Sequence, residues 1–210
     1  MRILCFGDSN TYGWNPGGYR NRFEDRWPNV LGACLGNVRI IEEGLGGRVF
    51  CHDNPNWVGR NGLTYLFPCI QTHQDFDLIC IMLGTNDVNT AYHETVQDIA
   101  NEARTMLRLI MTPEIYDTRK CPKVLLIAPL ALNDECTSPF FTEGFGTRAV
   151  EITRQLPDAL KQVADEYGAY FFDASAVVKG SITDGIHLLE ADHHTLGEAL
   201  AEPVRAILEL

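Results

Sequence analysis

The sequence is poor in basic residues and contains no cluster of Lys and Arg. Seventeen Lys and Arg stand against 28 Asp and Glu, so the formal net charge over 210 residues is −11. The electrostatic field of a negatively charged protein repels phosphate backbones, which makes nucleic acid a poor candidate partner. No apolar run approaches the ~20 residues that a membrane-spanning helix requires. The first residues lead straight into a strand-like segment without a signal peptide, so we expect a cytoplasmic protein with no membrane partner.

The seven cysteines lack the spacings of a zinc ligand set, and an odd number cannot all pair. Cys5 and Cys80 lie inside apolar runs, where free cysteine behaves as a small buried hydrophobic residue. We therefore expect reduced thiols.

The histidines also fail to indicate a metal site. His187 is followed by His193-His194, but no carboxylate or cysteine stands at a familiar ligand spacing, and a polar helix face is the simpler interpretation. His52, His73 and His93 have no evident partners. We predict neither a metal nor an organic cofactor.

Five short, nearly continuous apolar runs recur along the chain, as expected of parallel strands that are covered on both faces. They are Ile3–Phe6, Val38–Ile41, Leu78–Leu83, Val124–Ala128 and Ala169–Phe172. The stretches with helical periodicity are Arg26–Leu35, Leu63–His73, Thr95–Met111, Thr147–Tyr167 and Ala191–Glu209. This alternation predicts an α/β sandwich with a mostly parallel sheet of five strands. Without a linker or repeat, residues 1–210 are expected to form one domain.

The least regular stretch is Pro129–Gly146, which contains Phe140, Phe141 and Phe145. It can be a long surface loop, and its aromatic content equally suits a substrate-pocket wall or a subunit contact.

Ligands of open α/β sheets bind beyond the carboxyl ends of the strands, and Ser9 directly follows the first predicted strand. A serine hydroxyl becomes a nucleophile when a nearby base takes its proton. The alternative is that Asp8 or Ser9 merely caps a helix, which would be the better explanation of Gly7-Asp8-Ser9 alone.

A candidate base lies near the end of the chain, in Asp184-Gly185-Ile186-His187. This spacing lets the carboxylate reach the imidazole Nδ1 and fix its tautomer, which leaves Nε2 to face a serine. Considered alone, the tetrapeptide is explained as well by an Asp-Gly turn before a helix.

Two further loops offer hydrogen-bond donors. The side-chain amide of Asn86 follows the most hydrophobic strand and can donate to a developing oxyanion, whereas we expect Asp87 to cap the next helix. Gly46 and Gly47 follow the second strand, and glycine permits close approach of a backbone N–H. Their spacing matches neither a P-loop nor a dinucleotide fingerprint.

Together these four blocks resemble the SGNH/GDSL hydrolase family, in the order that is typical of it. They are Gly7-Asp8-Ser9, a glycine after the second strand, Gly84-x-Asn86-Asp87, and Asp184-x-x-His187. The wider chain is most similar to the intracellular arylesterase/acyltransferase branch. The Gly46-Gly47 pair departs from that branch, whose members carry a small non-glycine residue here.

The resemblance implies a three-layer α/β/α, flavodoxin-like fold and ester hydrolysis through an acyl-serine intermediate. It implies that Ser9 is the nucleophile, His187 the general base and Asp184 the orienting acid. The oxyanion donors would be the Ser9 and Gly47 backbone N–H groups and the Asn86 amide. It also implies a homo-oligomer.

The predicted function is hydrolysis of short acyl esters of small molecules, extending to acyl transfer if the pocket excludes water. The alternatives are a carbohydrate O-acetyl esterase, a thioesterase or lysophospholipase, and a non-catalytic binding protein. Candidate residues of the substrate pocket are Asp8, Asn10, Trp14, Gly46, Phe140 and Phe141. For Trp27 and Trp57, core packing is the simpler interpretation.

Overall fold

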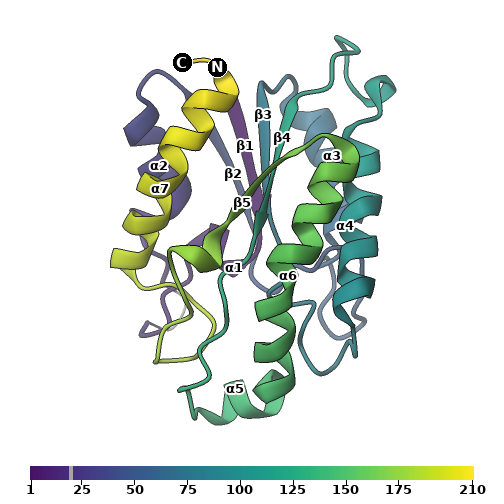
Figure 1. Ribbon diagram of the computed structural model, residues 1–210. Coiled ribbons are helices and arrows are strands. Elements are labelled where there is room, and N and C mark those ends of the chain that lie inside the picture. The colour runs from purple at the N-terminus through teal and green to yellow at the C-terminus, as the bar shows by residue number, and fades with distance from the viewer. Residues whose placement is uncertain (19–20) are drawn as a thin grey trace.

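A computed structural model describes residues 1–18 and 21–210, in which five strands form one parallel sheet (Figure 1). The strands are β1 (Arg2–Gly7), β2 (Arg39–Gly44), β3 (Leu78–Met82), β4 (Lys123–Ala128) and β5 (Tyr170–Asp173). Their order is β2-β1-β3-β4-β5, and every neighbouring pair is parallel. The carboxyl ends of all five strands therefore meet at one edge of the sheet, and the order reverses between β1 and β3, where doubly wound proteins bind their ligands.

Helices cover both faces of the sheet and make three layers (Figure 1). Helices α2 (Trp27–Leu35) and α7 (Glu190–Leu208) pack on one face, and α3 (Gly62–His73), α4 (Val96–Ile110) and α6 (Gly146–Tyr167) on the other. The short helices are α1 (Ser9–Tyr12) and α5 (Pro139–Gly144), with 3₁₀ turns at Pro113–Ile115 and Ala174–Ala176. The predicted α/β fold with a parallel sheet is confirmed.

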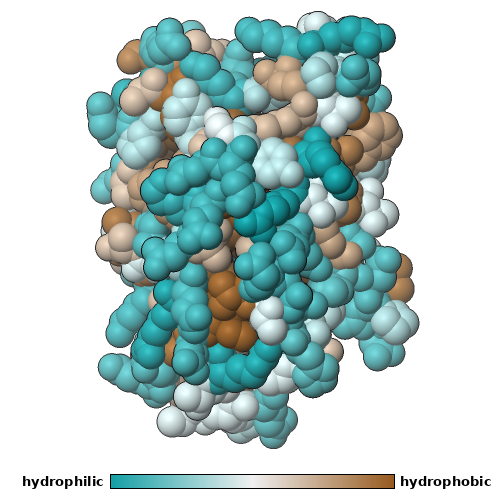
Figure 2. Space-filling view, turned by 45° about the vertical axis from the view of Figure 1, so that its right-hand side comes forward, coloured by the Kyte–Doolittle hydropathy of each residue, from teal (hydrophilic) through white to brown (hydrophobic). Residues whose placement is uncertain are grey.

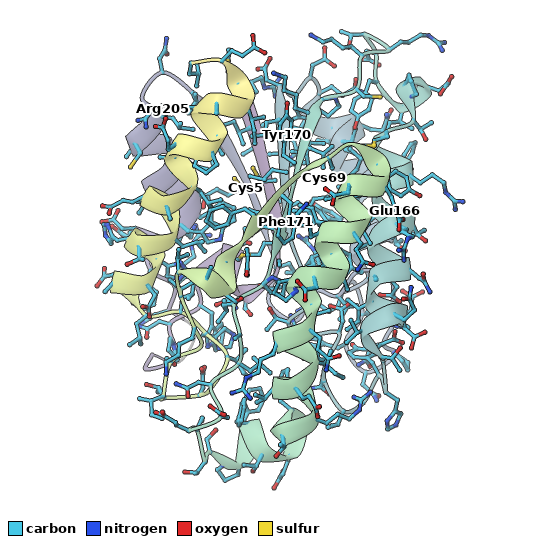
Figure 3. The ribbon with its side chains drawn as sticks, in the orientation of Figure 1. Cys5, Cys69, Glu166, Tyr170, Phe171 and Arg205 are labelled. Carbon is cyan, nitrogen blue, oxygen red and sulfur yellow. The ribbon has the colours of Figure 1, made fainter. Side chains whose placement is uncertain are left out.

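Side chains of the central strands alternate between two hydrophobic cores. In β1, Leu4 and Phe6 belong to the core beneath α3, α4 and α6, whereas Ile3 and Cys5 belong to the core beneath α2 and α7. Figure 3 marks Cys5 together with Cys69 of α3, which belongs to the opposite core. Because both faces of the strand are buried, its sequence is continuously apolar instead of alternating.

The second strand was predicted too early, at Val38–Ile41, whereas β2 extends to Gly44 and includes two glutamates. The prediction failed because it required apolar residues, and β2 is an edge strand. Its glutamates have polar partners, since Glu42 forms an ion pair with Arg26 and Glu43 accepts from the Tyr65 hydroxyl at 3.1 Å.

The aromatic stretch Pro129–Gly146 is not a long surface loop, because it contains α5. Ser138 caps this helix, with its hydroxyl accepting from the Phe141 N–H at 3.3 Å. Phe141 and Phe145 are buried and stack on each other, while Phe140 is 64% exposed. Most of the aromatic content is therefore core packing.

The face shown in Figure 2 is mainly hydrophilic, with a hydrophobic area in a hollow below its centre and other hydrophobic areas scattered between the polar side chains. Across the described part of the chain, no helix combines the length and apolar character needed to cross a membrane.

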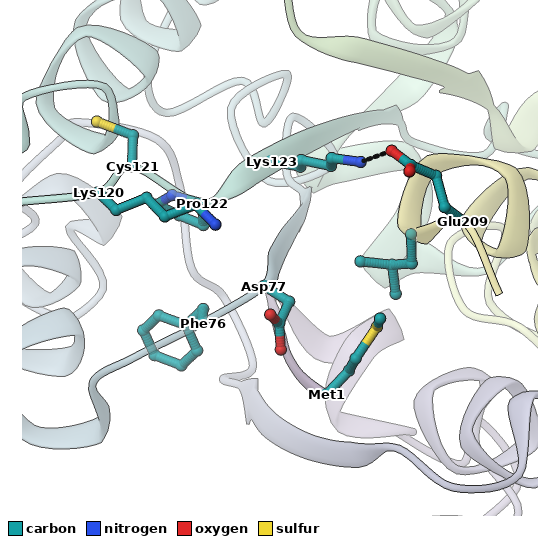
Figure 4. Close-up of a pocket in the computed structure, with 9 residues that line it drawn as sticks. Met1, Phe76, Asp77, Lys120, Cys121, Pro122, Lys123 and Glu209 are labelled. Atoms are coloured by element: carbon teal, nitrogen blue, oxygen red, sulfur yellow. Dashed lines mark hydrogen bonds and ion pairs between the residues drawn. The ribbon is translucent and has the colours of Figure 1, made fainter. Parts of the chain in front are cut away.

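A surface pocket lies at the amino ends of the strands (Figure 4). Met1 precedes β1, Asp77 precedes β3, and Lys123 at the start of β4 forms an ion pair with Glu209 at 3.0 Å. This pocket is thus at the opposite edge of the sheet from the motif loops.

Candidate active site

The structure brings Ser9, His187 and Asp184 together in one chain of hydrogen bonds. The Ser9 Oγ lies 2.8 Å from His187 Nε2, and His187 Nδ1 lies 2.6 Å from Asp184 Oδ2. Ser9 and His187 are buried, and Asp184 is partly buried. This is the geometry in which a carboxylate orients an imidazole and the imidazole accepts a proton from a serine.

Ser9 is held at the first residue of α1 by tight packing of the preceding turn. The Asp8 carboxylate accepts from the Asn10 N–H at 2.8 Å, so Asp8 caps α1. A Cβ on Gly7 would lie 2.1 Å from Thr11 Oγ1 and 2.7 Å from the Met82 carbonyl. The helix-capping explanation therefore applies to Asp8, and it coexists with a nucleophilic position for Ser9.

The loop that carries His187 is organised by Asp184 and Asn10. Asp184 Oδ1 accepts from the backbone N–H groups of Ile186 and His187, both at 3.0 Å. The Asn10 side chain accepts from Leu188 N–H at 3.0 Å and donates to the Ile186 carbonyl at 3.3 Å. These bonds tie the loop to α1 and so fix the imidazole opposite Ser9.

Hydrogen bonding keeps Asp184 ionised. Burial tends to raise its pKa, but the hydrogen bond with His187 and those from the Ile186 and His187 N–H groups hold the pKa below its usual range. An ionised Asp184 stabilises the imidazolium that forms when His187 takes a proton.

Potential oxyanion donors lie in the segments that follow β1, β2 and β3. The Ser9 N–H belongs to the first turn of α1, whose N–H groups have no partner within the helix. The Asn86 Nδ2 donates to the Arg48 carbonyl at 3.0 Å, which orients the amide and leaves its second N–H. Gly47 has φ +75°, and a Cβ there would lie 2.3 Å from the Trp57 ring, whereas Gly46 has open space around its Cα. This difference favours Gly47 as the residue that requires glycine.

Asn86→Ala is expected to lower kcat by about 10²- to 10³-fold, because a developing oxyanion would lose one donor. KM should change little, since a ground-state carbonyl needs that donor less. Steady-state kinetics on an activated ester measures both, and a loss confined to KM would exclude Asn86 from the oxyanion hole.

Arg48, which sequence analysis missed, links three motif loops. Its Nη1 donates to the Gly7 carbonyl at 2.9 Å and also to the Glu43 carbonyl, and its own carbonyl receives the Asn86 amide. The guanidinium lies 4.1 Å from the centroid of the Phe6 ring. Burial lowers the pKa of Arg48 to about 10, so it remains charged at neutral pH. The only signal for it was a basic residue directly after Gly46-Gly47.

Arg48→Met keeps the length of the side chain and removes its donors. The carbonyls of Gly7 and Glu43 then each lose a hydrogen bond from a charged donor, and bonds of this kind are worth about 1.5–3 kcal/mol. The Gly7 carbonyl keeps the Leu45 N–H as a donor at 3.1 Å, so it is not left without a partner. We expect a loss of about 3 kcal/mol in the free energy of unfolding, measured by urea denaturation. An unchanged urea midpoint would contradict this role.

Asp8 is fully buried, and burial raises its pKa from 3.8 to about 6. The folded protein therefore binds this proton more tightly than the unfolded chain, and stability is lost as the pH rises from about 4 to about 6. Asp8→Asn removes the titration and keeps the acceptor for the Asn10 N–H. Its stability relative to the parent should increase by up to about 3 kcal/mol between pH 4 and pH 8. Urea unfolding of both proteins across this range provides the measurement, and a constant difference would refute the expectation.

The sequence predicted that Asp87 caps the next helix, and this prediction is wrong. Helix α4 is capped instead by Thr95, whose hydroxyl accepts from the Asp98 N–H at 3.2 Å. Asp87 is fully buried, accepts from the Phe50 N–H at 2.8 Å, and has a pKa raised by burial to about 7. It therefore joins the Asn86 loop to the segment that follows Gly47.

Of the six predicted pocket residues, three have side chains that are held inside the fold and three remain available to a substrate. The side chains of Asp8 and Asn10 make internal hydrogen bonds, and Phe141 is buried against Gly185, so none of these three presents its side chain to a substrate. The Trp14 ring lies 6.0 Å from the His187 ring, centroid to centroid, and can line an acyl pocket. Phe140 is exposed and Gly46 is unobstructed.

The other tryptophans differ from each other. Trp27 is fully buried, as expected of core packing. Trp57 is 47% exposed and covers Gly47, so core packing was the wrong interpretation for it.

Comparisons with known proteins identify the family of this chain. The sequence model of the GDSL-like lipase/acylhydrolase family matches residues 5–195 of this chain. An aryl esterase from M. smegmatis is 37% identical, with a TM-score of 0.91 over 98% of this chain and 99% of that one. A carbohydrate acetylesterase from Sinorhizobium meliloti is 35% identical, with a TM-score of 0.92 over the same shares of the two chains. No curated protein matches the sequence significantly. The family resemblance is thus confirmed, and the chain belongs to the GDSL-like lipase/acylhydrolase family of ester-hydrolysing enzymes.

Proposed function

We propose that this protein is a serine esterase in which Ser9 is the nucleophile, His187 the general base and Asp184 the orienting acid. The observation that carries the proposal is the continuous chain from Ser9 Oγ through both imidazole nitrogens to Asp184 Oδ2. Each link is short enough for proton transfer or for orientation of the ring.

In the first half-reaction, His187 Nε2 accepts the Ser9 proton while Oγ bonds to the ester carbonyl carbon. The carbonyl π electrons move to oxygen, and the Ser9 and Gly47 N–H groups and the Asn86 amide donate to the oxyanion. The C–O bond to the leaving alcohol then breaks, and the alkoxide takes the proton from His187.

In the second half-reaction, water gives a proton to His187 and attacks the acyl carbon. The tetrahedral adduct collapses, Ser9 Oγ leaves and regains its proton from His187, and the carboxylic acid is released. A second alcohol in place of water would give acyl transfer. The chain's own residues supply every proton-transfer group that this mechanism requires.

Short acyl esters of small molecules are the proposed substrates. Support comes from Trp14 beside His187 and Trp57 over Gly47, which put large rings next to the proposed base and next to one proposed oxyanion donor. The two similar structures are an aryl esterase and a carbohydrate acetylesterase. A screen of acetyl, butyryl and longer p-nitrophenyl esters, with acetylated sugars beside them, tests the proposal. Turnover that rises with chain length would favour a lysophospholipase or thioesterase instead.

A carbohydrate O-acetyl esterase is the second candidate, favoured by the similarity to the acetylesterase. It predicts a higher kcat/KM on acetylated sugars than on aryl acetates. Lack of turnover on every activated ester would instead revive a non-catalytic binding protein.

We also propose a single-domain protein that works in the cytoplasm as a homo-oligomer. All seven cysteines, which lie in the described part of the chain, are free thiols, as suits a reducing compartment. The exposed Phe140 on α5 supports a subunit contact. Light scattering that gives a monomeric mass at micromolar concentration would refute the oligomer.

A further inference from the structure

A cluster of ionisable side chains outside the triad joins the segment after β2 to α4. It consists of His52, Glu94 immediately before the α4 cap, and Glu102 on α4, and we call it the His52 cluster. His52, which has no evident partner in the sequence, thus has two partners in the fold.

One imidazole nitrogen faces two carboxylates. His52 Nε2 lies 2.7 Å from Glu94 Oε1 and 2.8 Å from Glu102 Oε1. Neither contact has the geometry of a hydrogen bond, and His52 Nε2 has no hydrogen-bond partner among residues 1–18 and 21–210. Neither carboxylate oxygen therefore receives a well-directed N–H from the ring. The ring is kept in place by stacking on Tyr92, with centroids 5.3 Å apart.

A fourth group, Asp87, points into the cluster from the buried side. Asp87 is fully buried, and its Oδ2 has no hydrogen-bond partner among residues 1–18 and 21–210; the same holds for Glu102 Oε2. The two carboxyl groups are in contact. Carboxylate oxygens only accept, so a contact between them requires either a shared proton or a cation.

No basic side chain in the described ranges forms an ion pair with these carboxylates other than His52. Arg148 reaches Glu94 but donates to its backbone carbonyl. Two carboxyl groups therefore face one imidazole, and a third, that of Asp87, lies behind Glu102.

We propose that His52, Glu94 and Glu102 bind a divalent transition-metal cation of the Zn²⁺ class, with Asp87 orienting Glu102 from behind. One imidazole and two carboxylates form the mixed N/O donor set that such ions accept. Bonds of about 2.0–2.2 Å require the ligand atoms to move apart by roughly half an ångström. The His52 side chain is 33% exposed, which leaves an approach from solvent and room for water as a further ligand.

A similar group, Glu43, Cys69 and His73, provides a natural comparison. There each carboxylate oxygen already has its own partner, the His73 ring at 2.9 Å and the Tyr65 hydroxyl at 3.1 Å. Burial raises the pKa of the Cys69 thiol to about 12, so it is not a thiolate at neutral pH. This second group is a satisfied ion pair and is not expected to bind the metal.

The test is calorimetric titration of the chelator-treated full chain with Zn²⁺ and with Co²⁺. We expect one equivalent to bind to the parent protein, at least a tenfold loss of affinity in His52→Gln and in Glu102→Gln, and no change in the matched control His73→Gln. Circular dichroism checks that the variants are folded. Neither substituted residue belongs to the triad, so the outcome is independent of esterase activity.

Two further measurements test whether the metal binds at the His52 cluster and not elsewhere. Metal should raise the Tm of the parent and of His73→Gln but not that of Glu102→Gln. The Co²⁺ complex should show d–d absorption without a thiolate-to-cobalt charge-transfer band. Cys51 lies beside the cluster, because its thiol donates to the Glu102 backbone carbonyl at 3.7 Å. Absence of binding, binding that survives both His52→Gln and Glu102→Gln, or a thiolate band from Cys51 or Cys69 would each overturn the proposal. Absence of metal binding would mean that a shared proton alone permits the contact between the carboxyl groups of Asp87 and Glu102.

Discussion

Ser9→Ala should lower kcat on an activated ester by on the order of 10⁶-fold while the protein remains folded. The hydroxyl is the atom that bonds to the acyl group, and the structure places its only described hydrogen-bond partner, His187 Nε2, at 2.8 Å. Removal of Oγ leaves the oxyanion donors and the pocket intact, so a small residual rate and a nearly unchanged KM are expected.

A fluorophosphonate probe gives a second measurement of the same change. The parent should be labelled once, and Ser9→Ala should not be labelled at all. Ser175, which follows β5 at the same edge of the sheet, is a matched serine control. Its hydroxyl donates to Asp173 and, within the described ranges, forms no hydrogen bond with a histidine. Ser175→Ala should retain labelling and turnover. Labelling that persists in Ser9→Ala would exclude Ser9 as the nucleophile.

Asp184→Asn should lower kcat by about 10⁴-fold, with little change in stability. Asp184 Oδ1 accepts from two backbone N–H groups, so the amide oxygen of the replacement will take this position. Its NH₂ group then faces His187 Nδ1, which must become the acceptor. The ring proton moves to Nε2, and that nitrogen can no longer accept the proton of Ser9.

The lower kcat of Asp184→Asn is therefore expected from the wrong tautomer of His187 and not from a loss of folded protein. The Tm should stay close to that of the parent, and fluorophosphonate labelling should be slowed in proportion to kcat. Asp134→Asn is the control, because that carboxylate pairs with Arg154 at the surface. A loss of less than tenfold in Asp184→Asn would mean that another group orients His187.

The sequence predicted the central strands well because both of their faces are buried. Continuous apolar residues at Leu78–Leu83 and Val124–Ala128 leave little choice of structure. It predicted the edge strand β2 poorly, because exposure permits Glu42 and Glu43 within a strand. It also missed α5, whose aromatic residues suit a loop as well as a short helix.

Much of the candidate site was available from the sequence. The order of the strands could not be predicted from the sequence. Any parallel sheet, however, places the residues that follow its strands at one edge. Ser9, Asn86 and the pair Gly46-Gly47 all follow strands, so they were expected at that edge. Local turn chemistry brings Asp184 to His187, because three residues with a flexible Gly185 bring the carboxylate to Nδ1.

What only the tertiary structure decided are the contacts between residues far apart in the chain. Arg48 acts on the carbonyls of Gly7 and Glu43 through the packing of β1 against β2. His52 meets Glu94 and Glu102 only because the segment after β2 lies against α4. Side-chain type and local spacing produce the ordered motifs whose family resemblance implies the reaction class. Pairing between distant segments depends on how the layers pack. That packing determines which buried charges find partners.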